Sequence, residues 1–458
     1  MSDRITRAIA EYAVGVSGEL NDRIRHETRR RVLDSIGTAL GAFHQSTPTV
    51  ARRYAYQTPF LSGSLIWGTP FRTTPEAATL ANGVAIRYFD FNDTYLGLEP
   101  LHPSDMIAGM AAMGEWINSS GADLILATAI GYEVGVNLCD ALSVRKFGWD
   151  HPIITSIGAT AGLCRMMGLS QLETENALSL TIVPHVPMRQ TRAGELSMWK
   201  GAAAADAVRQ SVYACLLAAS GMQGPFQPFE GEMGFVRQLV GGSISNEAAL
   251  ASIFEGRSPT RLADTYIKAW PVEYHAQSGV DAALQIRKEI GDPSRISRIN
   301  IATFKASYEI IGKDPEKWHP KTRETADHSL QYIVTAALLD GRVNQETFSM
   351  ERISDPVIQR MLQDAVTLEE DDALTAGYPE GIPNRVEVET VDGKRYVREV
   401  KFPPGHARNP MSDELLQEKY TSLVEPMLGG ETAAKVARIV GALETVPNVR
   451  DLTKLLVV

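Results

Sequence analysis

Cysteine is scarce in this chain of 458 residues, which contains only Cys139, Cys164 and Cys215. No CxxC spacing joins them, and each stands in an apolar stretch with helical character. Isolated cysteines in such surroundings are typical of buried, reduced thiols. An iron–sulfur cluster needs three or four thiolates presented together. The scattered cysteines therefore argue against a cluster-dependent enzyme.

Common catalytic signatures are also missing. The sequence has no Walker loop, no GxGxxG turn after a strand, no GxSxG elbow and no HExxH or comparable metal-ligand spacing. It has no internal repeat and no low-complexity tract. Any chemistry must therefore come from polar residues scattered among apolar ones.

Signals for export, membranes and nucleic acids are weak. The N-terminal segment MSDRITRAIAEYAVG predicts an amphipathic helix with acidic residues, unlike a signal or transit peptide. The most apolar stretch, residues 124–138, contains Glu133 and is short for a bilayer span. A net charge of -10 argues against a general nucleic-acid binder. We expect a cytoplasmic protein with no membrane or nucleic-acid partner.

Residues 1–262 have the pattern of successive helices. Asn21 is a good N-cap for a helix with one apolar side. Residues 121–142 and 201–221 are rich in alanine and glycine and apolar nearly all round. Such helices are typical of the middle of a bundle, where small residues allow close approach. A thick all-α core is predicted.

The pattern changes after residue 262. Alternating residues at 299–303, 386–390 and 396–400 predict strands. Asp392-Gly393 predicts a hairpin in which both turn residues take positive φ. Helices are predicted at residues 325–339 and 357–365.

The last part of the chain returns to a helical pattern. Beyond Pro403-Pro404, Ser412 is a good N-cap followed by two acidic residues. The predicted fold class is mainly α, with an all-α domain formed by residues 1–262 and 404–458. A smaller α+β domain, residues 263–403, is inserted before the C-terminal helices.

Polar residues gather in a stretch of sixteen residues. Asp90, Asp93, Thr94, His102 and Asp105 supply carboxylates, a hydroxyl and an imidazole close to a strongly apolar helix. On spacing alone the same residues also suit an ordinary loop, where they form turns and caps.

Basic residues or histidines recur just before apolar helices. His151, Lys200 and Lys268 each precede such a segment, and His275 follows Glu273 in the last of them. A buried lysine needs an anion; for Lys200 this is Glu195 or Asp206, or a substrate carboxylate. Because helix N-termini favour anions, converging N-termini and cations would suit a substrate with several carboxylates.

Several segments resemble the MmgE/PrpD family, where a D-x-[ND]-D-T…H-P-S-[DG] pattern recurs. The segments keep the family's order from about residue 80 to 425. They are DFNDTYLGLEPLHPSD, GWDHPIITSIGATAGLCRMMGL, MWKGAAAADAVRQSVYACLLAASGMQGP, WPVEYHAQSGVDAAL, ETADHSLQYIVTAALLDG and GHARNPMSDELLQEKY.

The resemblance implies a large all-α domain and an α+β lid with the active site between them, in a homodimer. Members of the family act on polycarboxylates by proton transfer, without a metal or a cofactor. They include 2-methylcitrate dehydratase, cis-aconitate decarboxylase and an iminodisuccinate epimerase. The implied catalytic residues are Asp90, His102, His151, Lys200 and Lys268. The implied substrate-binding residues are Asp93, Thr94, Glu273, His275 and Tyr308.

The predicted reaction is dehydration of 2-methylcitrate or a similar tricarboxylate. Decarboxylating relatives resemble K-x-F-P-A-H after the lysine, whereas Glu273 and His275 here resemble the dehydratase-like F-P-A-E-F-H. In this hypothesis Lys200 and Lys268 hold carboxylates and offset the developing charge. His102 or His151 is the base, and Asp90 positions a histidine or donates to the leaving group.

Three alternatives remain open. They are decarboxylation of cis-aconitate, epimerisation of an amino- or imino-dicarboxylate, and a polycarboxylate-binding protein without activity.

Overall fold

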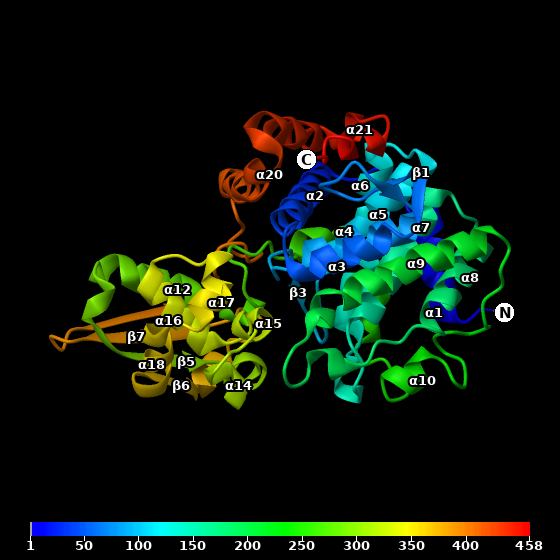
Figure 1. Cartoon of the computed structure of the whole chain (residues 1–458). Helices are drawn as coiled ribbons and strands as arrows, with labels where there is room; N and C mark the ends of the chain where they lie inside the picture. Colours follow the sequence, from blue (N-terminus) through cyan, green and yellow to red (C-terminus); the bar gives the residue numbers. More distant parts are fainter. Residues whose placement is uncertain (1) are drawn as a thin grey trace.

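The computed structural model describes residues 2–458 and is mainly helical, as predicted (Figure 1). One hydrophobic core gathers apolar side chains from both ends of the chain. Its principal helices are α1 (Arg4–Gly15), α2 (Asp22–Gly41), α4 (Pro75–Arg87), α5 (Ile107–Ile117), α6 (Gly121–Ala141), α7 (Pro152–Met167), α8 (Gln171–Ile182) and α9 (Ala203–Ala219). The predicted cap at Asn21 is present, because its side chain accepts a hydrogen bond from the Ile24 N–H.

Small residues let α6 and α7 pack backbone to backbone. A Cβ atom on Gly158 would lie 2.5 Å from the carbonyl oxygen of Gly131. The α6 helix is 21 residues long, longer than its apolar stretch suggested, and its length and composition would allow it to cross a membrane. However, 83% of its most apolar window is buried in this fold, and Glu133 accepts hydrogen bonds from Ser252 and Thr260. It is a core helix here.

Two short antiparallel ribbons interrupt the part of the chain that was predicted to be all-α. They are β1 (Pro59–Leu65) with β2 (Arg72–Thr73), and β3 (Tyr95–Leu96) with β4 (Pro100–Leu101). The strands β2, β3 and β4 have two residues each, too few to show alternation, and the seven residues of β1 do not alternate between buried and exposed. The β3–β4 ribbon matters for function, because it lies between Thr94 and His102 and brings them together.

A second hydrophobic core lies beside the first and contains a four-stranded sheet of order β6-β5-β7-β8 (Figure 1). Its strands are β5 (Ile296–Thr303), β6 (Val366–Glu370), β7 (Asn384–Thr390) and β8 (Arg395–Val400). Its longer helices are α12 (Gln277–Ile290), α16 (Leu330–Asp340) and α18 (Pro356–Asp364). The β7–β8 hairpin is present, but only Gly393 has positive φ, at 77°, since the turn is longer than two residues.

The predicted helix at residues 325–339 is broken. The short α15 (Arg323–Ala326) ends, and Ser329 then caps α16 by accepting a hydrogen bond from the Tyr332 N–H. Asp327 and His328 occupy the break, where their side chains are free to turn toward the first core.

The C-terminal helices return to the first core. Ser412 caps α20 (Asp413–Gly441) as predicted, and α20 packs along α2 before α21 (Val449–Thr453) (Figure 1). Gly429, with φ 74° and ψ 157°, kinks α20. The shorter helices are α3 (Ser46–Ala55), α10 (Phe235–Leu239), α11 (Ala251–Phe254), α13 (Lys305–Ser307), α14 (Pro315–Trp318), α17 (Met350–Ile353) and α19 (Asp372–Thr375).

Candidate active site

A cavity of about 120 Å³ lies where residues of the two cores meet. Most of the residues singled out in the sequence line it. They are Asp90, Thr94, His102, His151, Glu273 and His275. The cavity also has basic residues that the sequence patterns did not assign to the site. These are Arg87, Arg145, Arg189, Arg192 and Lys317.

Asp90 is the centre of a buried charge cluster. Its carboxylate lies 2.8 Å from Arg87 Nη1 and 3.1 Å from Lys200 Nζ, and it also contacts Lys268 Nζ. Each of the four residues is at most 2% exposed. Lys200 therefore pairs with Asp90 and, at 3.2 Å, with Asp327, and not with Glu195 or Asp206.

The charge state of Asp90 follows from these neighbours. Burial alone would raise the pKa of Asp90, but Arg87, Lys200 and Lys268 outweigh burial and hold this pKa well below its ordinary value. An ionised carboxylate accepts hydrogen bonds and has no proton to give. The geometry therefore favours a positioning role for Asp90 over the donation of a proton to a leaving group.

The backbone around Asp90 is unusual. Asp90 has φ of 51°, in the left-handed region that non-glycine residues seldom adopt. An antiparallel bridge pairs Thr94 with Tyr266, at 2.9 and 2.8 Å, and so draws the segment with Lys268 toward Asp90. The ammonium of Lys268 then donates to the Asp90 carbonyl oxygen at 2.9 Å. Residues far apart in the sequence thus hold a strained residue at the site.

His102 is held as one tautomer. Its Nδ1 lies 2.8 Å from the carbonyl oxygen of Asp93, which can only accept, so Nδ1 carries the proton. Its Nε2 then presents a lone pair toward Arg87 Nη2, at 2.9 Å. Burial, with the charges of Arg87 and Lys268, lowers the pKa of His102 well below its ordinary value. His102 is therefore a neutral base that faces the cavity.

Three further histidines each contact a carboxylate through Nδ1. The pairs are His151 with Asp150 at 3.2 Å, His275 with Glu273 at 2.8 Å, and His328 with Asp327 at 2.6 Å. All three histidines line the cavity. In residues 2–458, Nε2 of His151 and Nε2 of His275 are buried without a hydrogen-bond partner. Asp150 and Glu273 thus fix the rings of His151 and His275 and leave Nε2 free for a ligand, whereas Nε2 of His328 lies 3.6 Å from Asp90.

Burial favours the neutral form of His151 and of His328. It lowers the pKa of His151, although Asp150 opposes the shift, and it lowers the pKa of His328 to about 4. The rings of His102 and His151 lie edge to face with centroids 5.8 Å apart. Two imidazoles at this spacing can reach neighbouring atoms of one small molecule.

Asp90, Asp327 and His328 have the spacing of a metal site in the described part of the chain. The ammonium of Lys200 stands between the two carboxylates, and Arg323 Nη1 also pairs with Asp327 at 3.2 Å. The negative charges of this cluster are thus balanced by the chain's own cations.

Two of the expected substrate-binding residues do not line the cavity. Asp93 is fully buried behind it and accepts hydrogen bonds from Ser104 N and Tyr132 Oη, both at 2.8 Å. Its carbonyl group fixes His102, so Asp93 acts through that histidine. Tyr308 opens a π-helical turn (Tyr308–Gly312), and Ile310, two residues on, lines the cavity in its place.

Several of the residues that the sequence patterns did not assign to the site still stand in informative places in the sequence. Arg189 and Arg192 stand in a polar cluster with Lys200, and Asp327-His328 lies in a segment resembling the family. The helical pattern hid Asp327 and His328, because a helix was predicted to run through them. Arg87 ends α4 three residues before Asp90 and gave no signal beyond that spacing.

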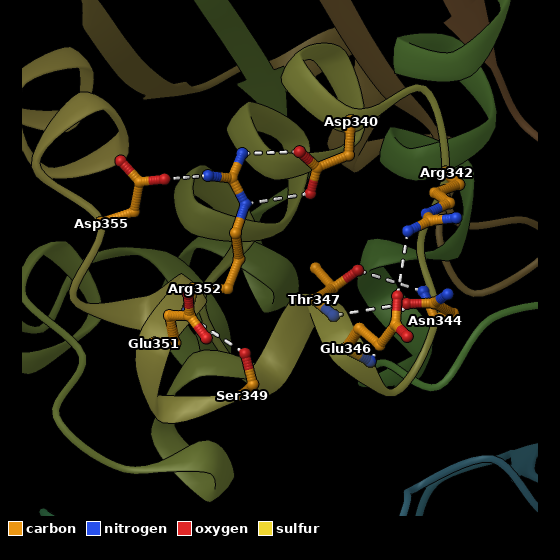
Figure 2. A pocket seen from close by; sticks show the side chains of 9 residues that line it. All are labelled: Asp340, Arg342, Asn344, Glu346, Thr347, Ser349, Glu351, Arg352 and Asp355. Carbon is orange, nitrogen blue, oxygen red and sulfur yellow. Dashed lines mark hydrogen bonds and ion pairs between the residues drawn. The ribbon is translucent and has the colours of Figure 1, made fainter.

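A second hollow, of about 490 Å³, lies on the surface of the α+β part and differs in character (Figure 2). Figure 2 shows Arg352 between Asp340 and Asp355, and it pairs with both. Arg342 pairs with Glu346 at 2.9 Å. The basic groups Arg342 and Arg352 of this hollow are already paired with carboxylates and no histidine lines it, so the cavity around Asp90 is the better candidate site.

Comparison with known families matches the whole architecture. A model of the MmgE/PrpD N-terminal domain matches residues 7–247, and a model of the MmgE/PrpD C-terminal domain matches residues 270–445. The chain belongs to the MmgE/PrpD family. The C-terminal match includes the whole of α20, although α20 packs into the first core.

Individual relatives are lyases of two kinds. The chain is 29% identical over 440 residues to 2-methylcitrate dehydratase of Salmonella typhimurium, covering 89% of this chain and 86% of the relative. It is 28% identical to the mitochondrial 2-methylcitrate dehydratase of Yarrowia lipolytica, covering 92% and 83%. It is 27% identical over 480 residues to human cis-aconitate decarboxylase, covering 100% and 95%. The similarity supports an enzyme, and a dehydratase-type member of this family.

Proposed function

We propose that this protein is a hydro-lyase that removes water from 2-methylcitrate, or a closely similar tricarboxylate, in the cavity around Asp90. A buried cavity that combines basic side chains with neutral histidines supports this function above all. Basic groups attract a polycarboxylate, and a neutral imidazole at pH 7 is ready to accept a proton from carbon.

His102 is the proposed base. Arg87 turns from Nε2 of His102 to the substrate carboxylate, and Nε2 then takes the proton from the carbon beside that carboxylate. The electron pair of that C–H bond forms the new double bond. The charge that develops on the carboxylate is offset by Arg87, which faces the cavity, and by Lys200 and Lys268 behind Asp90. Asp90 holds these three cations together.

A histidine paired with a carboxylate is the proposed acid. As the C–O bond breaks, the hydroxyl leaves as water with a proton from Nε2 of His275, whose imidazolium form Glu273 stabilises through its contact with Nδ1. His151 is not the proposed acid, because burial lowers its pKa and its Nε2 then carries no proton.

Dehydration is preferred over decarboxylation because of Glu273 and His275. Both reactions need a proton donor, for the leaving hydroxyl in dehydration and for the carbanion in decarboxylation, and the pattern of Glu273 followed by His275 resembles the dehydratase-like members. Decarboxylation of cis-aconitate is the second candidate function, supported by the relative of that name. Epimerisation of an amino- or imino-dicarboxylate and ligand binding without turnover are further outcomes for the experiment.

The proposal also covers the domain arrangement, the oligomeric state and the cellular location of the protein. Residues 263–403 act as a lid over residues 1–262 and 404–458, and the protein works as a homodimer in the cytoplasm. Light scattering on the purified protein measures the dimer directly.

Product analysis tests the reaction. The purified protein is incubated separately with 2-methylcitrate, citrate, cis-aconitate and iminodisuccinate, and products are identified by mass spectrometry. We expect loss of water from 2-methylcitrate and loss of this activity in Glu273→Gln. Release of carbon dioxide from cis-aconitate, a change of configuration only, or no turnover of any compound would each overturn the proposal.

A further inference from the structure

Three basic residues of the cavity differ from the others in having no carboxylate partner. Arg87 pairs with Asp90, and Arg192 pairs with Asp150 at 3.1 Å. Within residues 2–458, no carboxylate lies within 4.0 Å of the charged groups of Arg145, Arg189 or Lys317, although all three line the cavity.

The acidic groups near Arg145 and Arg189 are already engaged. Asp150 is taken by Arg192 and His151. Glu99 accepts hydrogen bonds from Ser143 Oγ at 2.8 Å and from the backbone N–H of Arg145 at 3.1 Å. Burial raises the pKa of Glu99, which weakens it further as a counter-ion. The two guanidinium groups are left to an outside anion.

Among the three residues, Lys317 has the highest free-energy cost of burial without a partner. It belongs to the short α14 helix and is only 5% exposed. Of its acidic neighbours, Asp327 pairs with Lys200 and Glu273 pairs with His275. The third, Asp314, also lines the cavity but lies more than 4.0 Å from the ammonium of Lys317. Burial of an unpaired ammonium lowers the pKa of Lys317 and disfavours the ligand-free fold. A ligand carboxylate would remove this cost.

We infer that Arg145, Arg189 and Lys317 each bind one carboxylate of the substrate and so select a tricarboxylate over a dicarboxylate. This rests on the proposed function only in placing the substrate in this cavity. Arg145 and Arg189 come from the first 262 residues and Lys317 from the α+β part. A ligand with three carboxylates therefore joins the two parts across the cavity.

Tricarballylate and glutarate form a matched pair of probes. They share a five-carbon dicarboxylate chain, and tricarballylate adds the central carboxylate but has no hydroxyl to lose. Binding can thus be measured by calorimetry without turnover. We expect wild type to bind tricarballylate more tightly than glutarate, because glutarate leaves one cation unpaired.

Each of the variants Arg145→Met, Arg189→Met and Lys317→Met should weaken tricarballylate binding by about tenfold to a hundredfold, the usual range for one charge-assisted contact. Because glutarate leaves one of the three cations unpaired, the variant at that position should leave glutarate binding nearly unchanged and shrink the preference for tricarballylate, whereas the other two variants should weaken both probes. Lys317→Arg should retain most of the preference. Without ligand, Lys317→Met should unfold at the same or a higher temperature than wild type.

Lys146→Met and Lys313→Met are the controls, because these exposed lysines stand in the same segments outside the cavity and carry the same charge. They should bind both probes as wild type does. Equal losses for both probes in all three variants, losses in the controls as large as in the variants, or unchanged binding in all three variants would overturn the inference. If the variants behave as expected but no substrate loses water, the proposed reaction fails and the tricarboxylate site stands.

Discussion

The ammonium of Lys268 contacts two oxygen atoms of Asp90: a carboxylate oxygen, and the backbone carbonyl oxygen at 2.9 Å. A second lysine binds the backbone at or next to both residues of this contact. Lys419 of α20 donates to the carbonyl oxygens of Phe91, at 2.7 Å, and of Lys268, at 3.0 Å, and pairs with Asp34 at 2.7 Å. Helix α20 thus stabilises the two loops that carry Asp90 and Lys268.

Removing Lys419 should strongly destabilise the protein. Lys419→Met leaves the buried Asp34 carboxylate unpaired and two carbonyl groups without a donor, and we expect a loss of about 3 to 5 kcal/mol of unfolding free energy. Urea unfolding measures it. Adding Asp34→Leu should recover part of the loss. Lys454→Met, which breaks an exposed pair with Asp451, should cost less than about 1 kcal/mol. Similar losses in both lysine variants would contradict the role of burial.

Substitutions at Asp90 should separate charge from backbone strain. Asp90→Asn removes the anion that holds three cations, and we expect turnover to fall by about a hundredfold or more. Asp90→Ala should lose turnover equally but be less stable than Asp90→Asn by about 1 kcal/mol, because asparagine adopts positive φ more readily. Steady-state kinetics and thermal unfolding measure the two effects. Equal stability of the two variants would show that the positive φ at position 90 costs no free energy of unfolding.

Loss of the proposed base should lower kcat more than it raises KM. For His102→Gln we expect kcat to fall by about a hundredfold to ten-thousandfold, the usual contribution of one acid or base. Retention of wild-type kcat, with the fold intact by circular dichroism, would exclude His102 as the base. His44→Gln, at an exposed histidine outside the cavity, is the matched control and should behave as wild type does.

Acid should destabilise the protein partly through His328. Burial lowers the pKa of His328 from 6.5 to about 4, so between these values the unfolded chain binds a proton that the folded chain does not. Its contribution to stability is therefore present above pH 6.5 and is lost as the pH falls toward 4, by about 3 kcal/mol at most. In urea unfolding at a series of pH values, His328→Asn should show a shallower decline than wild type. If the stability of wild type and of His328→Asn falls equally with pH, His328 does not contribute to the acid sensitivity.

Local patterns were enough to predict much of the fold. Both N-caps at Asn21 and Ser412, the small-residue helices and the β7–β8 strands followed from spacing and residue type. The break at Asp327 and His328 was missed, because a polar pair within an otherwise helical pattern has no distinctive period. The two-residue strands β3 and β4 were missed for a similar reason.

The sequence by itself determined the candidates for the chemistry: Asp90, His102, His151, Lys200 and Lys268 all lie at or directly behind one cavity. Only the tertiary structure decided which cation faces which anion. Lys200 reaches Asp327 across 127 positions in the chain, and Arg145, Arg189 and Lys317 are left unpaired. Ion pairing depends on distances of a few ångströms between segments brought together by folding, and no local period or propensity encodes those distances.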